Sequence, residues 1–423
     1  MTFVHKKIIS ALLFIGFTLI ILTESVINSY ASDNDTRPPQ SLYAQYAALV
    51  DGENNRLLYG KNADKKVPMA STTKIMTCII AIEYAPLDLK CETSSYASSM
   101  PEVKLHASKG EIFCLKDMLY SLMLRSHNDT AVIIAENVAS YYLTRKGEEL
   151  PDSSQELVSV FTGLMNQKAA ELGLCSTYYI TPNGLDAEDS NGIHSTTAYE
   201  LAVVMSYCIK NDTFLKITQT HDYSFSSNKR SYSVTNANTF LNMYPGIISG
   251  KTGFTAQAGY CYVCAYKDDD RTLIAVVLAC GWPYNKSYKW SDCKKLLDYG
   301  RKNYTRQVLL RSDDKPKKIS YNSGYSSYEI KPQPDISDDI TCLLCSDDKV
   351  NIVYSYTLPD KSGGITAGDL IGNIDIYIND GHYKSVALKS DINIPEIDYR
   401  YYFKFCINSF FVKYSDNLST KNN

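Results

Sequence analysis

The sequence predicts an α/β domain followed by a small all-β domain, and three features of the chain support this fold class. Apolar runs typical of strands lie near residues 43–59 and again at 258–278. Helical periodicity fills most of the chain between them. Beyond about residue 308 the helical pattern ends, and short alternating runs take its place. The sheet of the first domain is therefore expected to join both ends of its segment, with helices packed against it.

The composition is that of a globular protein, with 44% hydrophobic and 21% charged residues. Its 423 residues suffice for about two or three domains, each with its own core. The 43 basic and 46 acidic side chains leave a net charge of −3. This balance argues against nucleic acid as a partner, because a phosphate-binding surface would add basic residues.

Residues 1–31 are typical of a signal peptide. Lys6 and Lys7 precede an uncharged run of 15 residues, and Ser29 and Ala31 supply small side chains for cleavage after residue 31. An uncleaved anchor helix is the alternative, but Glu24 comes too early for the roughly 20 apolar residues that a span needs. We therefore expect export to the outer face of the cytoplasmic membrane or to the cell wall.

The first domain is expected to cover residues 41–304. It begins with a hairpin, in which the turn 51–55 joins strands at 43–50 and 56–59. A helical pattern starts at Ser71, and later segments predict four more helices, two strands and a closing helix. These segments are 115–124, 130–139, 155–172 and 196–208 for the helices, 258–265 and 272–278 for the strands, and 286–299 for the closing helix.

The small β domain is expected at residues 308–392, where alternating runs such as 371–378 and 383–388 predict strands. The tail, residues 393–423, mixes aromatic side chains with Arg400, Lys404 and Lys413. This mixture favours contact with a membrane surface, although the polar residues do not gather on a single helical face. A last strand and a disordered end are the alternatives for the tail.

Twelve cysteines lie after residue 31, and export would permit disulfides between them. Two CxxC pairs occur, at residues 261–264 and 342–345, but 77 residues separate them. That separation is far beyond the spacing of a zinc ribbon. Buried thiols or scattered disulfides are therefore favoured, and no metal is expected.

Three short motifs carry the candidate chemistry: Ser71-Thr72-Thr73-Lys74, Ser126-His127-Asn128 and Lys251-Thr252-Gly253. Each motif has chance copies elsewhere in the chain, so the interpretation depends on their order and context. Ser71 and Lys74 share one face of the first turn of a predicted helix, where the amine can reach the hydroxyl. The second motif falls in a loop between two helices. The third precedes a strand, where Gly253 would let a substrate backbone approach closely.

Together the three motifs resemble the set found in penicillin-recognising serine enzymes. Further segments resemble one branch of these enzymes, the low-molecular-mass penicillin-binding proteins that are serine D-Ala-D-Ala carboxypeptidases of the peptidase family S11 type. The resemblance covers most of residues 41–392 and implies an antiparallel sheet flanked by helices, of the β-lactamase and transpeptidase type. His127 departs from the aspartate of the general pattern. The supporting segments are Pro68-Met69-Ala70-Ser71-Thr72-Thr73-Lys74-Ile75-Met76-Thr77, Leu172-Gly173-Leu174, Asn183-Gly184-Leu185-Asp186, His194-Ser195-Thr196-Thr197-Ala198, Lys251-Thr252-Gly253-Phe254-Thr255 with Ala258-Gly259-Tyr260, and, for the β domain, Ala367-Gly368-Asp369 to Leu388.

The resemblance also implies a catalytic role for the first two motifs. Ser71 would attack the carbonyl of the D-Ala-D-Ala bond in a peptidoglycan stem pentapeptide and form an acyl-enzyme. Lys74 would be the base, with its pKa lowered by burial and by the positive Lys251. Ser126 would relay the proton to the leaving amine, and Asn128 would hold the substrate amide.

The third motif is implied to bind the end of the substrate. Lys251 and Thr252 would bind the terminal carboxylate, and Gly253 would let the substrate backbone approach the strand. The backbone N–H groups of Ser71 and Phe254 would form the oxyanion hole. β-Lactams would acylate the same serine, and neither a metal nor an organic cofactor has a role.

Three alternatives use the same residues or the same cleft. A DD-endopeptidase would cut cross-links with this site, and the sequence separates it poorly from a carboxypeptidase. A class A β-lactamase would need a glutamate for deacylation, but between Ser126 and Lys251 no glutamate has an asparagine four residues on. The third alternative is a catalytically inactive wall-binding module.

Overall fold

The computed structural model describes residues 37–419, except 325 and 360–362, and its description of side chains ends at residue 409. The predicted signal peptide, residues 1–31, lies outside the described residues.

The central sheet has five strands in the order β2-β1-β11-β10-β9, and every neighbouring pair is antiparallel. β1 (Tyr46–Asp51) and β2 (Leu57–Lys61) form the predicted hairpin. β11 (Thr272–Leu278) pairs with β1 on one side and with β10 (Gly259–Lys267) on the other, so the sheet joins both ends of the segment as predicted. β9 (Ile247–Thr255) is the edge strand.

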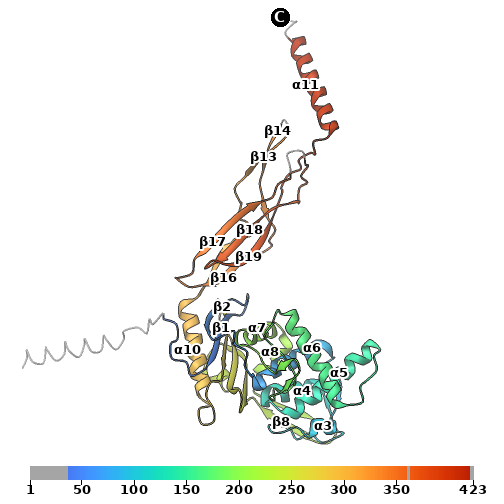
Figure 1. Ribbon diagram of the computed structural model, residues 1–423, viewed down its shortest axis with the longest axis vertical. Helices are drawn as coiled ribbons and strands as arrows, with labels where there is room; N and C mark the ends of the chain where they lie inside the picture. The colour runs from blue at the N-terminus through green and yellow to red at the C-terminus, as the bar shows by residue number, and fades with distance from the viewer. Residues whose placement is uncertain (1–36, 325, 360–362, 420–423) are drawn as a thin grey trace, which may run out of the picture. The chain divides into compact units, whose positions relative to one another are not determined.

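Both faces of this sheet are buried, because alternate side chains enter two separate cores. Val276 belongs to the core that the middle helices share, whereas Val277 faces the core that α10 (Tyr288–Asn303) closes with Leu296. Figure 1 shows α10 on one side of the sheet and α7 and α8 on the other. The helices of the first core are α2 (Lys74–Tyr84), α3 (Ser95–Ser98), α4 (Leu115–Tyr120), α5 (Asn128–Lys146), α6 (Ser154–Glu171), α7 (Ala198–Cys208) and α8 (Asp212–Gln219).

Shorter elements connect these helices. Several of them carry site residues or border the cleft described below. They are the 3-10 turn η1 (Ala70–Thr73), the π-helical turn η2 (Ser121–Arg125), α9 (Phe240–Met243) and three two-stranded antiparallel sheets. The sheets pair β3 (Lys90–Glu92) with β4 (Ile112–Cys114), β5 (Glu188–Asp189) with β6 (Gly192–Ile193), and β7 (Asp222–Ser226) with β8 (Ser231–Thr235).

After α10 the chain is rich in β-structure, as predicted. A four-stranded sheet has the order β15-β19-β18-β17, and its side chains form a core of their own with Ile330, Ile374 and Leu388. The predicted strands at 371–378 and 383–388 are β18 and β19. The strands are β12 (Thr305–Leu310), β13 (Ile319–Ser323), β14 (Ser326–Ile330), β15 (Gln333–Pro334), β16 (Ile340–Leu344), β17 (Val350–Tyr356), β18 (Leu370–Ile378) and β19 (Gly381–Lys389). The predicted fold class, an antiparallel sheet flanked by helices followed by a β domain, is confirmed.

The tail forms helix α11 (Tyr399–Ser419), so the alternative of a last strand is wrong. Within the described residues, none of the helices has the length and apolar character needed to cross a membrane. All twelve cysteines fall in the described part of the chain, and each is a free thiol there. Cys261 and Cys264 enter opposite cores, because an odd number of steps along a strand reverses the face.

Candidate active site

Ser71 lies in η1, directly before α2. The expected α-helical turn is thus a tighter 3-10 turn, because Thr72 and Thr73 donate side-chain hydrogen bonds to the carbonyls of Met69 (2.6 Å) and Ala70 (2.8 Å). Ala70 has a φ of +48°, in the left-handed region that non-glycine residues rarely adopt. Strain of this kind is typical of functional sites, where the surrounding structure must hold it.

The Lys74 amine is fully buried and touches three oxygens. It lies 2.8 Å from Ser71 Oγ, 2.9 Å from Asn128 Oδ1 and 2.6 Å from the Asn183 carbonyl. Burial lowers the pKa of Lys74 well below its usual value, and the charge of Lys251 lowers it further. A neutral amine has two hydrogens and one lone pair. Since the oxygens of Asn128 and Asn183 can only accept, they take the hydrogens and leave the lone pair for the Ser71 hydroxyl.

The second motif forms a sharp corner above this pair. Ser126 follows η2 with a φ of +66°, and its Oγ lies 2.8 Å from Lys251 Nζ. Asn128 begins α5 and donates its amide hydrogens to two backbone carbonyls of residues 101 and 102, at 3.2 and 3.1 Å. Because Asn128 Oδ1 also accepts from Lys74, only one lone pair of that oxygen is left for a substrate amide.

Lys251, Thr252, Gly253 and Phe254 precede the predicted strand at 258–265, which is β10, but they also lie inside a strand of their own, β9, that was not predicted. The glycines at 250 and 253 weaken the strand signal of this segment. Lys251 is only 2% exposed, and burial lowers its pKa to about 7. A Cβ on Gly253 would lie 2.9 Å from the Ser71 nitrogen. The close approach that needs this glycine is therefore that of the Ser71 turn, a reason the sequence did not suggest.

The segment containing Asn183 and Gly184 is a functional element that the residue predictions missed. Gly184 has a φ of +83°, and a Cβ there would come within 2.1 Å of the Ala70 carbonyl oxygen. Only glycine lets this loop press against η1, and that contact brings the Asn183 carbonyl to Lys74. The resemblance had marked the segment, but a backbone carbonyl leaves no signature of its own in a sequence.

Two buried histidines support the site from behind. His194 Nδ1 accepts from the backbone N–H of Ile180 at 3.0 Å, so its Nε2 carries the hydrogen and donates to Thr73 Oγ1 at 2.8 Å. Burial lowers the pKa of His194 to about 4, so the ring is neutral near pH 7 and keeps its single hydrogen on Nε2. His127 Nδ1 lies 2.8 Å from Ser121 Oγ, and burial lowers its pKa to about 3. Each neutral ring joins a motif to a neighbouring segment.

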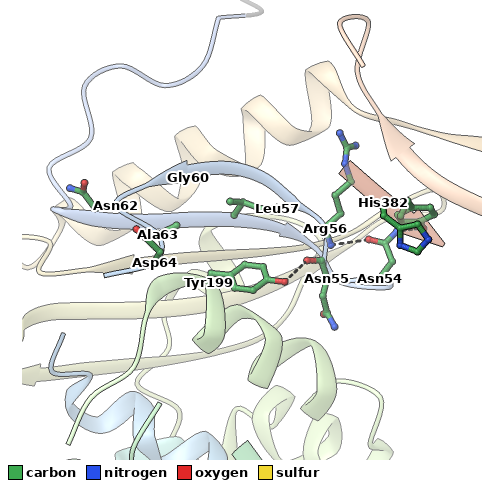
Figure 2. A pocket seen from close by; sticks show the side chains of 11 residues that line it. Asn54, Asn55, Arg56, Leu57, Gly60, Asn62, Ala63, Asp64, Tyr199 and His382 are labelled. Atoms are coloured by element: carbon green, nitrogen blue, oxygen red, sulfur yellow. Dashed lines mark hydrogen bonds between the residues drawn. The ribbon is translucent and has the colours of Figure 1, made fainter. Parts of the chain in front are cut away.

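The three motifs line one cleft of about 640 Å³, with Lys74 beneath its floor. A second hollow of about 680 Å³ lies elsewhere, around the β1–β2 turn (Figure 2). Figure 2 shows the Tyr199 hydroxyl donating to the Asn55 carbonyl, at 3.1 Å. None of the predicted site residues lines this second hollow, and no serine and lysine meet there. Its lining is Asn54, Asn55, Arg56, Leu57, Gly60, Asn62, Ala63, Asp64, Tyr199, His382 and Tyr383.

The fold is that of solved penicillin-binding proteins. The structure of penicillin-binding protein 5 from Haemophilus influenzae aligns with 85% of this chain and all of its own length, at a TM-score of 0.66 and 22% sequence identity. Residues 32–281, more than half of the chain, match the family model described as D-alanyl-D-alanine carboxypeptidase, Peptidase S11. The chain therefore belongs to this peptidase family.

Curated relatives differ in the activity that their names carry. D-alanyl-D-alanine carboxypeptidase DacF of Bacillus subtilis is 28% identical over 330 residues, which span 76% of this chain and 78% of the relative. A D-alanyl-D-alanine endopeptidase of Pseudomonas aeruginosa is also 28% identical, over 232 residues that span 53% of this chain and 68% of the relative. Membership of the family therefore does not distinguish carboxypeptidase from endopeptidase activity.

Proposed function

We propose that this protein is a serine D-Ala-D-Ala carboxypeptidase that removes the terminal D-alanine from peptidoglycan stem pentapeptides and is acylated by β-lactams. One observation carries the proposal. The Lys74 amine is buried, has a lowered pKa and lies 2.8 Å from Ser71 Oγ in an open cleft. A nucleophile beside a neutral base is the arrangement that acyl transfer requires.

In the proposed acylation step, Lys74 takes the proton of Ser71 as the hydroxyl oxygen attacks the carbonyl carbon of the penultimate D-alanine. The N–H groups of Ser71 and Phe254 stabilise the developing oxyanion, and such a donor is typically worth about 3 kcal/mol of barrier. Gly253 supports this role, because it lets β9 lie against the Ser71 nitrogen. Lys251 and Thr252 hold the terminal carboxylate.

The leaving amine of the last D-alanine needs the proton that Lys74 has gained. Ser126 is the proposed relay, and its position 2.8 Å from Lys251 Nζ keeps its hydroxyl in the cleft. Asn128 orients the Lys74 amine and offers one lone pair to a substrate N–H. Water then hydrolyses the ester, with Lys74 acting as base a second time. No metal or organic cofactor is needed for these steps.

The carboxypeptidase is favoured over the endopeptidase by the extent of the similarity. The alignment to the DacF carboxypeptidase spans 76% of this chain, whereas that to the Pseudomonas endopeptidase spans 53%. The alignment to the endopeptidase therefore leaves more of this chain unmatched. The endopeptidase is kept as the second candidate, because it would use the same residues.

We also propose the organisation that goes with this activity. Residues 1–31 direct export, 41–304 form the peptidase domain, and 308–392 form the β domain. The tail, residues 393–423, lies at the membrane surface through side chains such as Tyr399, Tyr402 and Phe403, which are 75%, 47% and 68% exposed. The enzyme would thus act outside the cytoplasmic membrane, where the stem peptides are.

An intact-mass time course with benzylpenicillin, run on the mature protein and on Ser71→Ala, tests the proposal. A persistent adduct of one drug molecule on the wild type alone is expected. Release of D-alanine from a pentapeptide, compared with cleavage of a cross-linked dimer, then separates the two peptidase activities. An adduct that disappears while the drug is consumed would indicate a β-lactamase. The absence of any adduct would overturn the enzymatic assignment in favour of a binding module.

A further inference from the structure

The cleft continues past β9 onto a surface formed by Phe254, Tyr260, Lys289 and Trp290, which we call the aromatic–lysine shelf. Phe254 is 41% exposed, and its ring centroid lies 4.6 Å from that of Tyr260. The Lys289 amine lies 4.8 Å from the centroid of Tyr260 and 4.4 Å from that of Trp290. The shelf is thus an unbroken stack that begins at a residue of the proposed oxyanion hole.

The charge of the whole cleft favours an anion. Its lining contains four basic side chains, Arg125, Lys251, Lys286 and Lys289, against the single carboxylate of Glu102. The terminal carboxylate of the substrate would use Lys251. The positive charge on the shelf therefore has no assigned partner in the proposed reaction.

Lys289 has an unusual environment for a lysine. It is only 6% exposed, and burial lowers its pKa to about 8. Its amine donates to the Lys286 carbonyl, and among the described residues no carboxylate forms an ion pair with it. A buried amine without an opposite charge is costly unless a ligand supplies that charge.

A second polar group near the shelf also lacks a partner. Asn238 lines the same cleft, and its Nδ2 is buried without a hydrogen-bond acceptor in the described structure. Its Oδ1 accepts from the Tyr262 hydroxyl at 2.8 Å, and the Tyr262 ring lies 4.6 Å from the Trp290 ring. An unpaired amide donor and an amine without a carboxylate partner in the described structure therefore border one continuous part of the cleft.

The direction of the substrate follows from the proposed function, on which this inference rests. The terminal carboxylate lies at Lys251 and Thr252, and the scissile carbonyl lies at the Phe254 nitrogen. The chain on the amino side of the D-Ala pair must then continue past Phe254. One residue of extended chain adds about 3.3 Å, so the residue before the D-Ala pair lies beyond Phe254.

We propose that the aromatic–lysine shelf is a subsite for a carboxylate that the stem peptide carries on the amino side of D-Ala-D-Ala. Lys289 supplies the charge, and Tyr260 and Trp290 hold its amine in place. Two groups of the stem peptide could supply this carboxylate. One is an acidic side chain on the residue before the D-Ala pair, and the other is a free backbone carboxylate on the residue that precedes it. Either source makes the enzyme selective for acidic stems.

The test compares D-alanine release from three synthetic acyl-X-D-Ala-D-Ala peptides. X is Nε-acetyl-lysine in the first and a residue with a terminal side-chain carboxylate of similar length in the second. The third has the neutral X preceded by a γ-linked glutamate. The wild type is expected to have a kcat/KM about tenfold higher for one acidic peptide, through KM, as a hydrogen bond to a charged group allows.

Three variants decide what Lys289 contributes. Lys289→Met should abolish the preference and leave release from the neutral peptide within about twofold, whereas Lys289→Arg should keep the preference. Lys294→Met is the matched control, because this lysine is on the same helix but does not line the cleft. It should change neither rate.

The outcomes separate the subsite from the proposed function. Equal kcat/KM for all three peptides in the wild type would overturn the subsite alone. An equal loss on acidic and neutral peptides in Lys289→Met, with a normal benzylpenicillin adduct, would also overturn it, because the lysine would then be structural. Absence of D-alanine release from every peptide would overturn the proposed function and the subsite with it.

Discussion

Two hollows of similar volume, about 640 and 680 Å³, differ in whether their buried charged groups have partners of opposite charge. Around the β1–β2 turn the partly buried charge of Arg56 is paired with Asp348, and the Tyr199 hydroxyl donates to the Asn55 carbonyl. The group that is unpaired there in the described structure, Asn55 Oδ1, is neutral. In the cleft, Lys251 and Lys289 are buried without a carboxylate partner among the described residues. Volume therefore does not identify the site, and unpaired buried charge does.

This difference has a cost that falls on the cleft alone. A buried amine loses its hydration, which destabilises the charged form and lowers the pKa of the group. An ion pair such as Arg56–Asp348 in the second hollow contributes to the stability of the fold and leaves neither charge available for a ligand. The comparison therefore predicts large functional effects in the cleft, a stability gain when one of its amines is removed, and small effects in the other hollow.

The largest expected effect is that of Lys74→Met. The side chain keeps its volume and burial but loses the amine that is the proposed base beside Ser71. The rate of acylation by benzylpenicillin should fall at least about a thousandfold, within the range for loss of a general base. Intact-mass kinetics at several drug concentrations measure this rate. A variant that acylates at the wild-type rate would show that Ser71 is activated by another group.

His194→Ala is expected to act through position and not through contact with substrate. It removes the ring that joins the Ile180 N–H to Thr73, and so loosens η1 against the loop that carries Asn183. A shift of about 1 Å in such a site costs about a hundredfold in rate. The acylation rate should therefore fall by roughly that factor. His194→Asn, whose Oδ1 can replace Nδ1 as the acceptor, should recover part of it.

The exposed His221 provides the control for this prediction, since its side chain is 66% exposed. His221→Ala should leave the acylation rate unchanged. A His194→Ala variant that loses thermal stability but acylates normally would contradict the positioning role.

The sequence predicted the parts of the site that local spacing determines. Ser71 and Lys74 fall three residues apart in a helical pattern, and the strands at 258–265 and 272–278 are apolar runs, as expected for a sheet buried on both faces. The contacts that complete the site are not local. Gly253 and Gly184 both press on η1 from distant segments, and the Asn183 carbonyl reaches Lys74 across 109 positions. Neither the positive φ of Ala70 nor the helix of the tail had a local signal strong enough to predict it.

Lys251→Met should make the protein more stable, with a definite dependence on pH. The folded pKa of Lys251 is about 7, whereas an unfolded lysine has a pKa of about 10.4. Between these values the unfolded chain holds a proton that the folded chain lacks, so the free energy of unfolding of the wild type rises with pH. The variant lacks this dependence. Its melting temperature should exceed that of the wild type most at pH 6 to 7, and the gap should close toward pH 10.

Differential scanning fluorimetry across this pH range measures the gap. Lys294→Met, at a 60% exposed lysine, is the control and should show no such trend. A gap that does not depend on pH would mean that Lys251 carries no buried charge penalty.

The smallest effect is expected in the second hollow, from Tyr199→Phe. The substitution removes one hydroxyl, which donates to the Asn55 carbonyl at 3.1 Å, and leaves the ring packed against the first core. Loss of one such hydrogen bond costs about 1 kcal/mol of stability, so the melting temperature should fall by a few degrees at most. The acylation rate should stay within about twofold of the wild type, because no group of the proposed mechanism touches this hollow. A tenfold loss of acylation would instead mean that the two hollows are coupled through α7, and the contrast drawn between them would fail.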